Sequence, residues 1–160
     1  MYVEVIHRWF GWTSAVQAQT QTFVAERVDG AGEKVSVRIP DQVLFNTEME
    51  AGFPVQYVVS AVIHHGQDLI EVYGSNATLR YEVDAEALTI AEAGDKQARP
   101  VDILPEDAYN LENWRVEQDF VDAIREGKEY HPSFEDGRRY MQVVQAVYDS
   151  AEQGRTVALA

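Results

Sequence analysis

Polar and apolar residues alternate through much of the first sixty positions of the chain, with the period of two that a half-buried β-strand requires. The alternation runs through residues 14–28, 35–49 and 55–63. Pro40 interrupts the second stretch, because proline cannot donate a hydrogen bond to a central ladder. The third stretch is apolar on both faces, so we expect a central strand there. One face of the first stretch carries a row of glutamines, which indicates either a solvated surface or a contact with a second sheet in an oligomer: Gln17, Gln19 and Gln21.

A β-hairpin is predicted where residues 69–73 and 77–81 flank the turn sequence Gly-Ser-Asn. Glycine and asparagine tolerate positive φ, so we expect Gly74 and Asn76 to provide that backbone geometry. The remaining segments of this kind are an edge strand at residues 87–91, a loop at 94–105 and a last strand at 156–159.

Three segments show helical spacing. Residues 1–11 look like the last turns of a helix that ends at Gly11. Two later helices each lie between a capping residue and a glycine: Asn110 to Gly127, and Ser133, which opens a capping-box pattern, to Gly154. We expect their apolar stripes to be buried against a sheet: Phe120, Ile124, Tyr140, Val144 and Val147.

These elements predict one domain over residues 1–160, of the α+β class, with an open, mostly antiparallel β-sheet and helices packed on one face. The net charge is −14. Binding of nucleic acid requires clustered lysine and arginine, so we expect no nucleic-acid partner. The acidity favours solubility, and a salt-adapted source is the alternative explanation.

Other function classes are disfavoured by what the sequence lacks. No apolar run is long enough to cross a bilayer and no secretory leader opens the chain, so we expect no membrane partner. Cysteine is absent, which removes thiolate catalysis and fits a reducing cytoplasm. The adjacent His64 and His65 would point to opposite faces of a strand, so no metal site is predicted there. The carboxylates show no catalytic pairing, and no catalytic residue is assigned.

Two motifs resemble one protein family. Residues 68–82, DLIEVYGSNATLRYE, resemble a segment of the C-terminal domain of the Gfo/Idh/MocA oxidoreductases, with Ala77 in place of a second glycine. Residues 120–127, followed by Pro132 and residues 135–137, resemble the closing pattern of the same family. Further matches are Arg8-Trp9-Phe10-Gly11, Ala146 to Ala151, Gly154-Arg155 and Val157. The resemblance covers nearly the whole chain, but only the family's second domain.

The resemblance implies a parent oxidoreductase that uses NAD or NADP on a sugar, polyol or related alcohol or carbonyl compound. The family's catalytic histidine would fall at Met1 or just upstream, so His7 is expected to be a surface or interface residue. No G-x-G-x-x-G occurs, and the three lysines lie in predicted loops: Lys34, Lys96 and Lys128. We therefore expect the chain alone to bind no cofactor and to be inactive.

The resemblance also implies a binding site and a partner. In inositol-dehydrogenase-like members, the residues just before the hairpin line the substrate pocket. The corresponding residues here are His64, His65 and Gln67. Family members commonly pair through the open sheet face, which implies a homo-oligomer, most simply a dimer. The alternative is a free-standing binding or oligomerisation module with the same fold and no redox chemistry.

Overall fold

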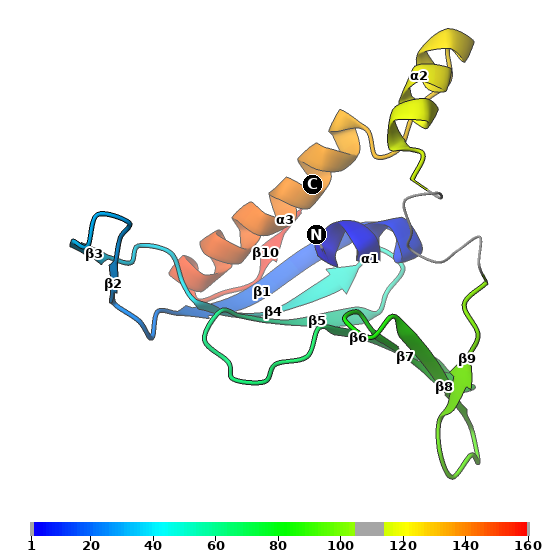
Figure 1. Cartoon of the computed structure of the whole chain (residues 1–160), viewed down its shortest axis with the longest axis horizontal. Helices are drawn as coiled ribbons and strands as arrows, with labels where there is room; N and C mark the ends of the chain where they lie inside the picture. The colour runs from blue at the N-terminus through cyan, green and yellow to red at the C-terminus, as the bar shows by residue number, and fades with distance from the viewer. Residues whose placement is uncertain (1, 105–113, 160) are drawn as a thin grey trace. The chain divides into compact units, whose positions relative to one another are not determined.

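The computed structural model describes residues 2–104 and 114–159 (Figure 1). Its helices are α1 Tyr2–Phe10, α2 Val116–Glu126 and α3 Phe134–Gln153. Its strands are β1 Thr13–Gln21, β2 Glu26–Val28, β3 Lys34–Ser36, β4 Gln42–Met49, β5 Pro54–Ser60, β6 Leu69–Tyr73, β7 Ala77–Glu82, β8 Ala87–Glu92, β9 Arg99–Val101 and β10 Val157–Ala158. All pairs among these strands are antiparallel, which confirms the predicted α+β class.

The chain forms two compact units. The first unit is Met1–Ile63 with Gly127–Ala160, and the second unit is His64–Glu126. The first contains a four-stranded sheet in the order β10, β1, β4, β5 and the separate hairpin of β2 and β3. The second contains a four-stranded sheet in the order β6, β7, β8, β9. That the 160 residues act as one domain stays a prediction.

The core of the first unit lies between its four-stranded sheet and α3, which packs against β1 (Figure 1). The alternation of the strands sends every second side chain toward the helix. The buried sheet side chains are Val16, Ala18, Phe45, Thr47, Met49 and Tyr57, and the buried helix side chains are Val143, Ala146, Val147 and Ser150. The opposite face of the sheet carries the glutamine row that the alternation predicts.

Both ends of α3 confirm the sequence pattern. The Ser133 hydroxyl accepts a hydrogen bond from the Asp136 N–H, and the Asp136 carboxylate accepts one from the Ser133 N–H. Gly154 closes the helix in the left-handed conformation that favours glycine. The chain then returns to the sheet as β10, which pairs with β1. Gly11 likewise ends α1, donating its N–H to the carbonyl of His7 at 3.0 Å.

The predicted helix stripes are partly wrong. Val147 is buried, but Val144 is exposed and the buried stripe of α3 includes Val143 and Ser150 instead. The reason is Ser150. Its hydroxyl accepts a hydrogen bond from the Ala18 N–H at 2.9 Å, on a part of β1 that the short strand β10 does not reach. A polar side chain therefore lies in the buried stripe, so a prediction from apolar residues alone places the stripe wrongly. Phe120 and Ile124 of α2 are also exposed, and Asn110 lies outside the described residues.

Three predictions about the strands are also wrong. The third stretch of alternation is β5, which among the described strands pairs only with β4 and is the edge strand of its sheet. It is therefore not the central strand that its two apolar faces predicted. The segment at residues 87–91 is not an edge strand, because β9 forms beyond it within the predicted loop. Residues 99–101, which form β9, were predicted as part of a loop because of Pro100, but an end strand tolerates proline.

The turn between β6 and β7 also differs from its prediction. Six glycines have positive φ, and neither Gly74 nor Asn76 shares that geometry. A Cβ atom at Gly74 would instead lie 3.1 Å from the carbonyl oxygen of Ala77, which accepts the Gly74 N–H at 2.9 Å. A close backbone approach, and not the φ angle, therefore favours glycine at this position.

Candidate functional site

The segment between β5 and β6 carries the predicted substrate-binding residues, and all three are exposed there: His64, His65 and Gln67. His65 has φ 54°, a left-handed conformation that histidine adopts more readily than most residues. This geometry turns the chain toward β6. Within the described residues, hydrogen bonds connect Gln67 to a neighbouring strand but connect neither histidine to it.

Gln67 is bound by Arg80 of β7. The Arg80 Nη2 group donates to the Gln67 side-chain oxygen at 3.2 Å. Because the carbonyl end of the amide is engaged, the NH₂ end is directed away from Arg80 and offers two hydrogen-bond donors. A molecule with hydroxyl or carbonyl oxygens is the complement of such a group.

Arg80 is itself held by two carboxylates on the same face of the sheet. Glu71 lies directly opposite Arg80 in the strand register, with Oε1 3.4 Å from Nη1. Glu82 approaches Nε at 3.1 Å. Tyr73 donates to the second oxygen of Glu71 at 3.0 Å, and this hydrogen bond raises the pKa of the Tyr73 phenol. The cluster fixes the guanidinium, and the guanidinium fixes the Gln67 amide. Sequence reasoning missed Arg80, although its cross-strand pairing with Glu71 follows from the hairpin register.

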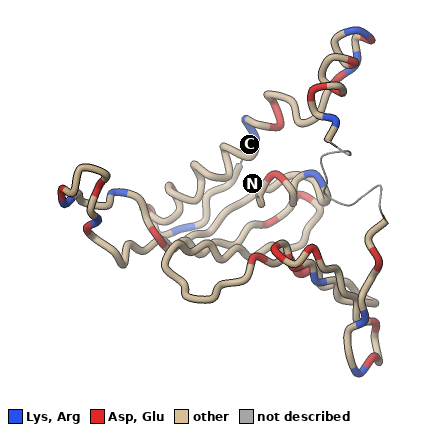
Figure 2. The backbone as a smooth tube through the Cα atoms, viewed as in Figure 1, with Lys and Arg blue, Asp and Glu red and all other residues tan. Residues whose placement is uncertain are grey.

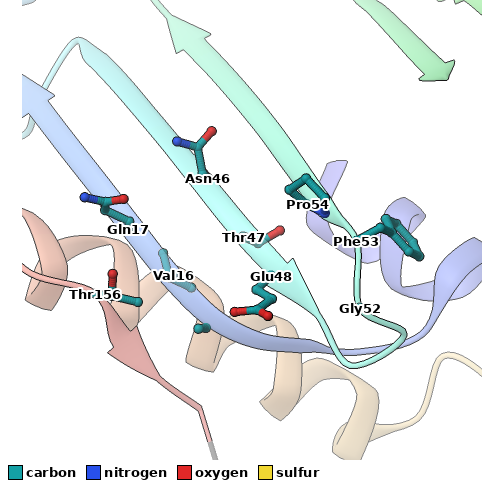
Figure 3. A pocket seen from close by; sticks show the side chains of 10 residues that line it. Val16, Gln17, Asn46, Thr47, Glu48, Gly52, Phe53, Pro54 and Thr156 are labelled. Carbon is teal, nitrogen blue, oxygen red and sulfur yellow. The ribbon is translucent and has the colours of Figure 1, made fainter.

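The open face of the first-unit sheet is a second candidate site. The strand register places Gln17, Asn46 and Gln56 side by side on β1, β4 and β5. Gln19, Leu44 and Val58 form the next row. Figure 3 shows Gln17 and Asn46 on neighbouring strands beside a shallow cavity of about 290 Å³. Its wall also includes Glu48, Phe53 and Pro54. This face has a row of amides beside exposed apolar side chains, so it suits contact with a second surface that has both polar and apolar side chains.

His7 is buried within the chain, so the expectation of a surface or interface position is wrong. Its Nε2 atom lies 2.9 Å from the Thr13 hydroxyl oxygen, and its ring meets the Trp12 ring edge-on with centroids 5.1 Å apart. Burial, followed by the charge of Arg139, lowers the pKa of His7. The hydrogen bond of His7 to Thr13 therefore joins α1 to β1.

Among residues 2–104 and 114–159, no group of three His, Asp or Glu side chains is suited to hold a metal ion. None of the helices formed by these residues is long and apolar enough to cross a bilayer.

The family model "Oxidoreductase family, C-terminal alpha/beta domain" matches residues 3–159. The chain belongs to the Gfo/Idh/MocA family of NAD-dependent oxidoreductases, as its C-terminal domain. No curated protein shows significant similarity to the chain.

Several solved structures share the fold of this chain. A levoglucosan dehydrogenase, in its apo form, is 24% identical with a TM-score of 0.84, over 99% of this chain and 49% of that one. The same enzyme in complex with NADH and L-sorbose is also 24% identical, with a TM-score of 0.84 over 99% of this chain and 48% of that one. An oxidoreductase domain protein from Kribbella flavida is 22% identical, with a TM-score of 0.81 over 99% of this chain and 48% of that one. The chain thus spans about half the length of these proteins.

Proposed function

We propose that this chain is the substrate-binding and oligomerisation domain of an oxidoreductase that acts on a sugar, polyol or related alcohol or carbonyl compound with NAD or NADP. The observation that carries the proposal is the Gln67 amide held by Arg80 at 3.2 Å, in the segment where the resemblance implies a substrate pocket. A fixed pair of N–H donors suits the many oxygens of such a substrate. Levoglucosan dehydrogenase, a protein of the same fold, has a complex with NADH and L-sorbose.

His64 and His65 are proposed to provide further contacts to the same substrate. Both side chains are exposed in the turn that leads to Gln67. An imidazole ring has one donor and one acceptor nitrogen when neutral, so either ring complements a hydroxyl group. Neither histidine is assigned the proton transfer at the substrate oxygen.

The residues of this chain do not fit the dinucleotide. A dinucleotide pyrophosphate is held where a glycine-rich loop joins a parallel strand to a helix. The described strands pair only in antiparallel fashion, and no G-x-G-x-x-G is present. The cofactor phosphates would also meet a chain of net charge −14. We therefore assign cofactor binding to another part of the parent protein, so that this chain alone is inactive.

We assign oligomerisation to the open sheet face, with a two-fold dimer as the simplest form. Leu44 and Val58 are exposed there beside polar amides, and an exposed apolar group of this kind marks a contact surface. The Gln17, Asn46 and Gln56 row would exchange hydrogen bonds across the contact. We place the working dimer in the cytoplasm.

The substrate assignment is tested by kinetics of the full protein encoded by the reading frame that contains this chain. Reduction of NAD and NADP is followed with levoglucosan, L-sorbose and myo-inositol as probes. Gln67→Leu should raise KM about tenfold for the accepted probe, the effect of one lost hydrogen bond, with a smaller change in kcat. Gln97→Leu, at an exposed glutamine of the same unit, is the matched control. Equal kinetics for the two variants would refute the role of Gln67.

The cofactor assignment is tested on the chain alone. Trp9, Trp12 and Trp114 provide intrinsic fluorescence for titration with NADH or NADPH. We expect no saturable quenching below millimolar concentration. Saturable binding at micromolar concentration would contradict the assignment, and a reading frame without a dinucleotide-binding domain would favour the free-standing module.

A further inference from the structure

A two-stranded arm extends from the first unit between β1 and β4 (Figure 1). We define the arm as residues 23–39, in which β2 pairs with β3 and with no other strand of the described residues. Phe23 and Ile39 lie at its base and are 67% and 70% exposed. Val28 and Val35, on the strands themselves, are exposed as well. Four large apolar side chains on one short ribbon are unusual for a surface that meets only water.

The arm is held in place at its base. Asp41, directly before β4, is buried and accepts hydrogen bonds from the Phe23 N–H at 2.9 Å and the Val24 N–H at 2.8 Å. These two donors lower the pKa of the Asp41 carboxyl group, since they stabilise its charged form. The Val37 N–H also donates to the Ala25 carbonyl at 2.9 Å.

The tip of the arm is also built by hydrogen bonds. The Asp29 side chain accepts the Ala31 N–H at 2.9 Å and the Glu33 N–H at 3.0 Å. The Asp29 N–H donates to the Glu33 carbonyl at 2.9 Å. The apolar side chains are therefore displayed on a preformed ribbon, which lowers the entropy cost of any contact that they make.

The charge of the arm differs from that of the rest of the chain. It has three acidic residues, Glu26, Asp29 and Glu33, and three basic ones, Arg27, Lys34 and Arg38, so its net charge is zero. The whole chain carries −14, so all of the net negative charge lies outside the arm. Figure 2 shows basic and acidic positions intermixed along the arm. Two copies of the chain repel each other over most of their surfaces, and the arm is a part that approaches a second copy without net repulsion.

We propose that the arm is an interaction element that clasps a second copy of this chain, with Phe23 and Ile39 packed on the open sheet face of that copy. The inference rests on the proposed oligomerisation function and adds a second contact to it. The complementary surface is the row in which Leu44 lies beside Val58, which is 63% exposed. The arm carries no net charge and this row has no charged side chain. Each copy offers one of each surface, so the contact closes under two-fold symmetry.

The test is sedimentation of the full chain across a concentration series at moderate salt. The double variant Phe23→Ser, Ile39→Ser should raise the dimer dissociation constant at least tenfold. Ile63→Ser with Val121→Ser, which also removes two exposed apolar side chains, should leave it unchanged. Circular dichroism checks that all variants keep the same melting temperature.

A charge variant tests the arm without altering its apolar groups. Lys34→Glu with Arg38→Glu makes the arm acidic, and it should weaken the dimer more at low salt than at high salt. If both arm variants sediment like the wild type, while Val58→Glu gives monomers, the arm inference is overturned and the sheet-face dimer stands. That result is also expected if the arm contacts another domain of the parent. A wild-type chain that is monomeric throughout overturns both proposals.

Discussion

The two units of the chain differ in how they bury their side chains. Every buried apolar residue among residues 2–104 and 114–159 belongs to the first unit: Ile6, Val16, Ala18, Phe45, Met49, Tyr57, Val143, Ala146 and Val147. In the second unit the strands of the sheet are at best half-buried, and no residue of α2 is buried.

The difference suggests separate roles for the two units, stability for the first and substrate binding for the second. The first unit has a packed layer of helix on sheet, from which we expect most of the free energy of folding. The second unit carries the proposed substrate-binding residues on a sheet held by cross-strand pairs. Segments with few buried apolar contacts open with low free energy, and ligand-binding segments are commonly of this kind. We therefore expect the first unit to set the global stability of the chain.

The largest effect should come from Met49→Ala in the first unit. Met49 is 1% exposed, and its sulfur accepts the Thr13 and Thr47 hydroxyls at 3.7 and 3.8 Å. The cavity should lower the free energy of unfolding by about 2–5 kcal/mol, measured by urea denaturation. Met141→Ala, at a methionine of α3 that is 56% exposed, is the control and should change it by less than about 0.5 kcal/mol. Similar losses in both variants would contradict the burial pattern.

Ser150→Ala should have the next largest effect. The variant removes the hydroxyl that accepts the Ala18 N–H and donates to the Arg155 carbonyl at 2.7 Å. Leaving the buried Ala18 N–H without a partner should cost about 1–3 kcal/mol of unfolding free energy. Ser14→Ala, which loses only an exposed bond to the Glu48 carbonyl, is the matched control and should cost less. Equal unfolding midpoints for the two would show that Ser150 has no such role.

The N-terminus of α3 should make stability depend on pH. The pKa of Asp136 falls to about 2, first because the Ser133 N–H and then because His131 stabilises its charged form. The pKa of His131 is raised by the same pair, with Nδ1 at 2.7 Å from Asp136. The Asp136 contribution is therefore present above its ordinary pKa of 3.8 and is lost as pH falls toward 2. The His131 contribution is full below 6.5 and is lost as pH rises through its raised pKa.

Asp136→Asn measures both changes. Because it weakens the capping box, it should lower the unfolding free energy by about 1 kcal/mol near pH 6. The difference from the wild type should shrink as pH rises through the raised pKa of His131, and again as pH falls toward 2. A difference that does not change between pH 2 and 9 would contradict the ion pair.

The smallest effect is expected in the second unit. Ile124→Ser removes a large apolar side chain from α2, but Ile124 is exposed, so the free energy of unfolding should change by less than about 0.5 kcal/mol. Val147→Ser, on the buried face of α3, is the comparison and should cost several times more in the same urea titration. A large loss at Ile124 would show that the second unit contributes to the global core.

The strand alternation predicted the buried side chains of the first-unit sheet well, because the alternation has a direct structural cause. Phe45, Thr47 and Met49 alternate with exposed residues on β4, and a sheet with one covered face requires that pattern. The caps of α3 were predictable because they are local: Ser133 makes hydrogen bonds within the first turn, and Gly154 adopts the positive φ angle that favours glycine. Ser150, Gly74 and Arg80 were not, since each depends on an atom brought near by the fold: the Ala18 N–H, the Ala77 carbonyl and the Gln67 oxygen.

The most direct test of the difference between the units is native-state hydrogen exchange, resolved by residue, in increasing urea. The amides of Val16 and Phe45 in the first unit should exchange only through global unfolding. Those of Leu79 and Ile90, which are paired in the second unit, should exchange through local opening at a distinctly lower free energy. A single free energy of exchange for all four amides would mean that the units unfold together, and would contradict the account.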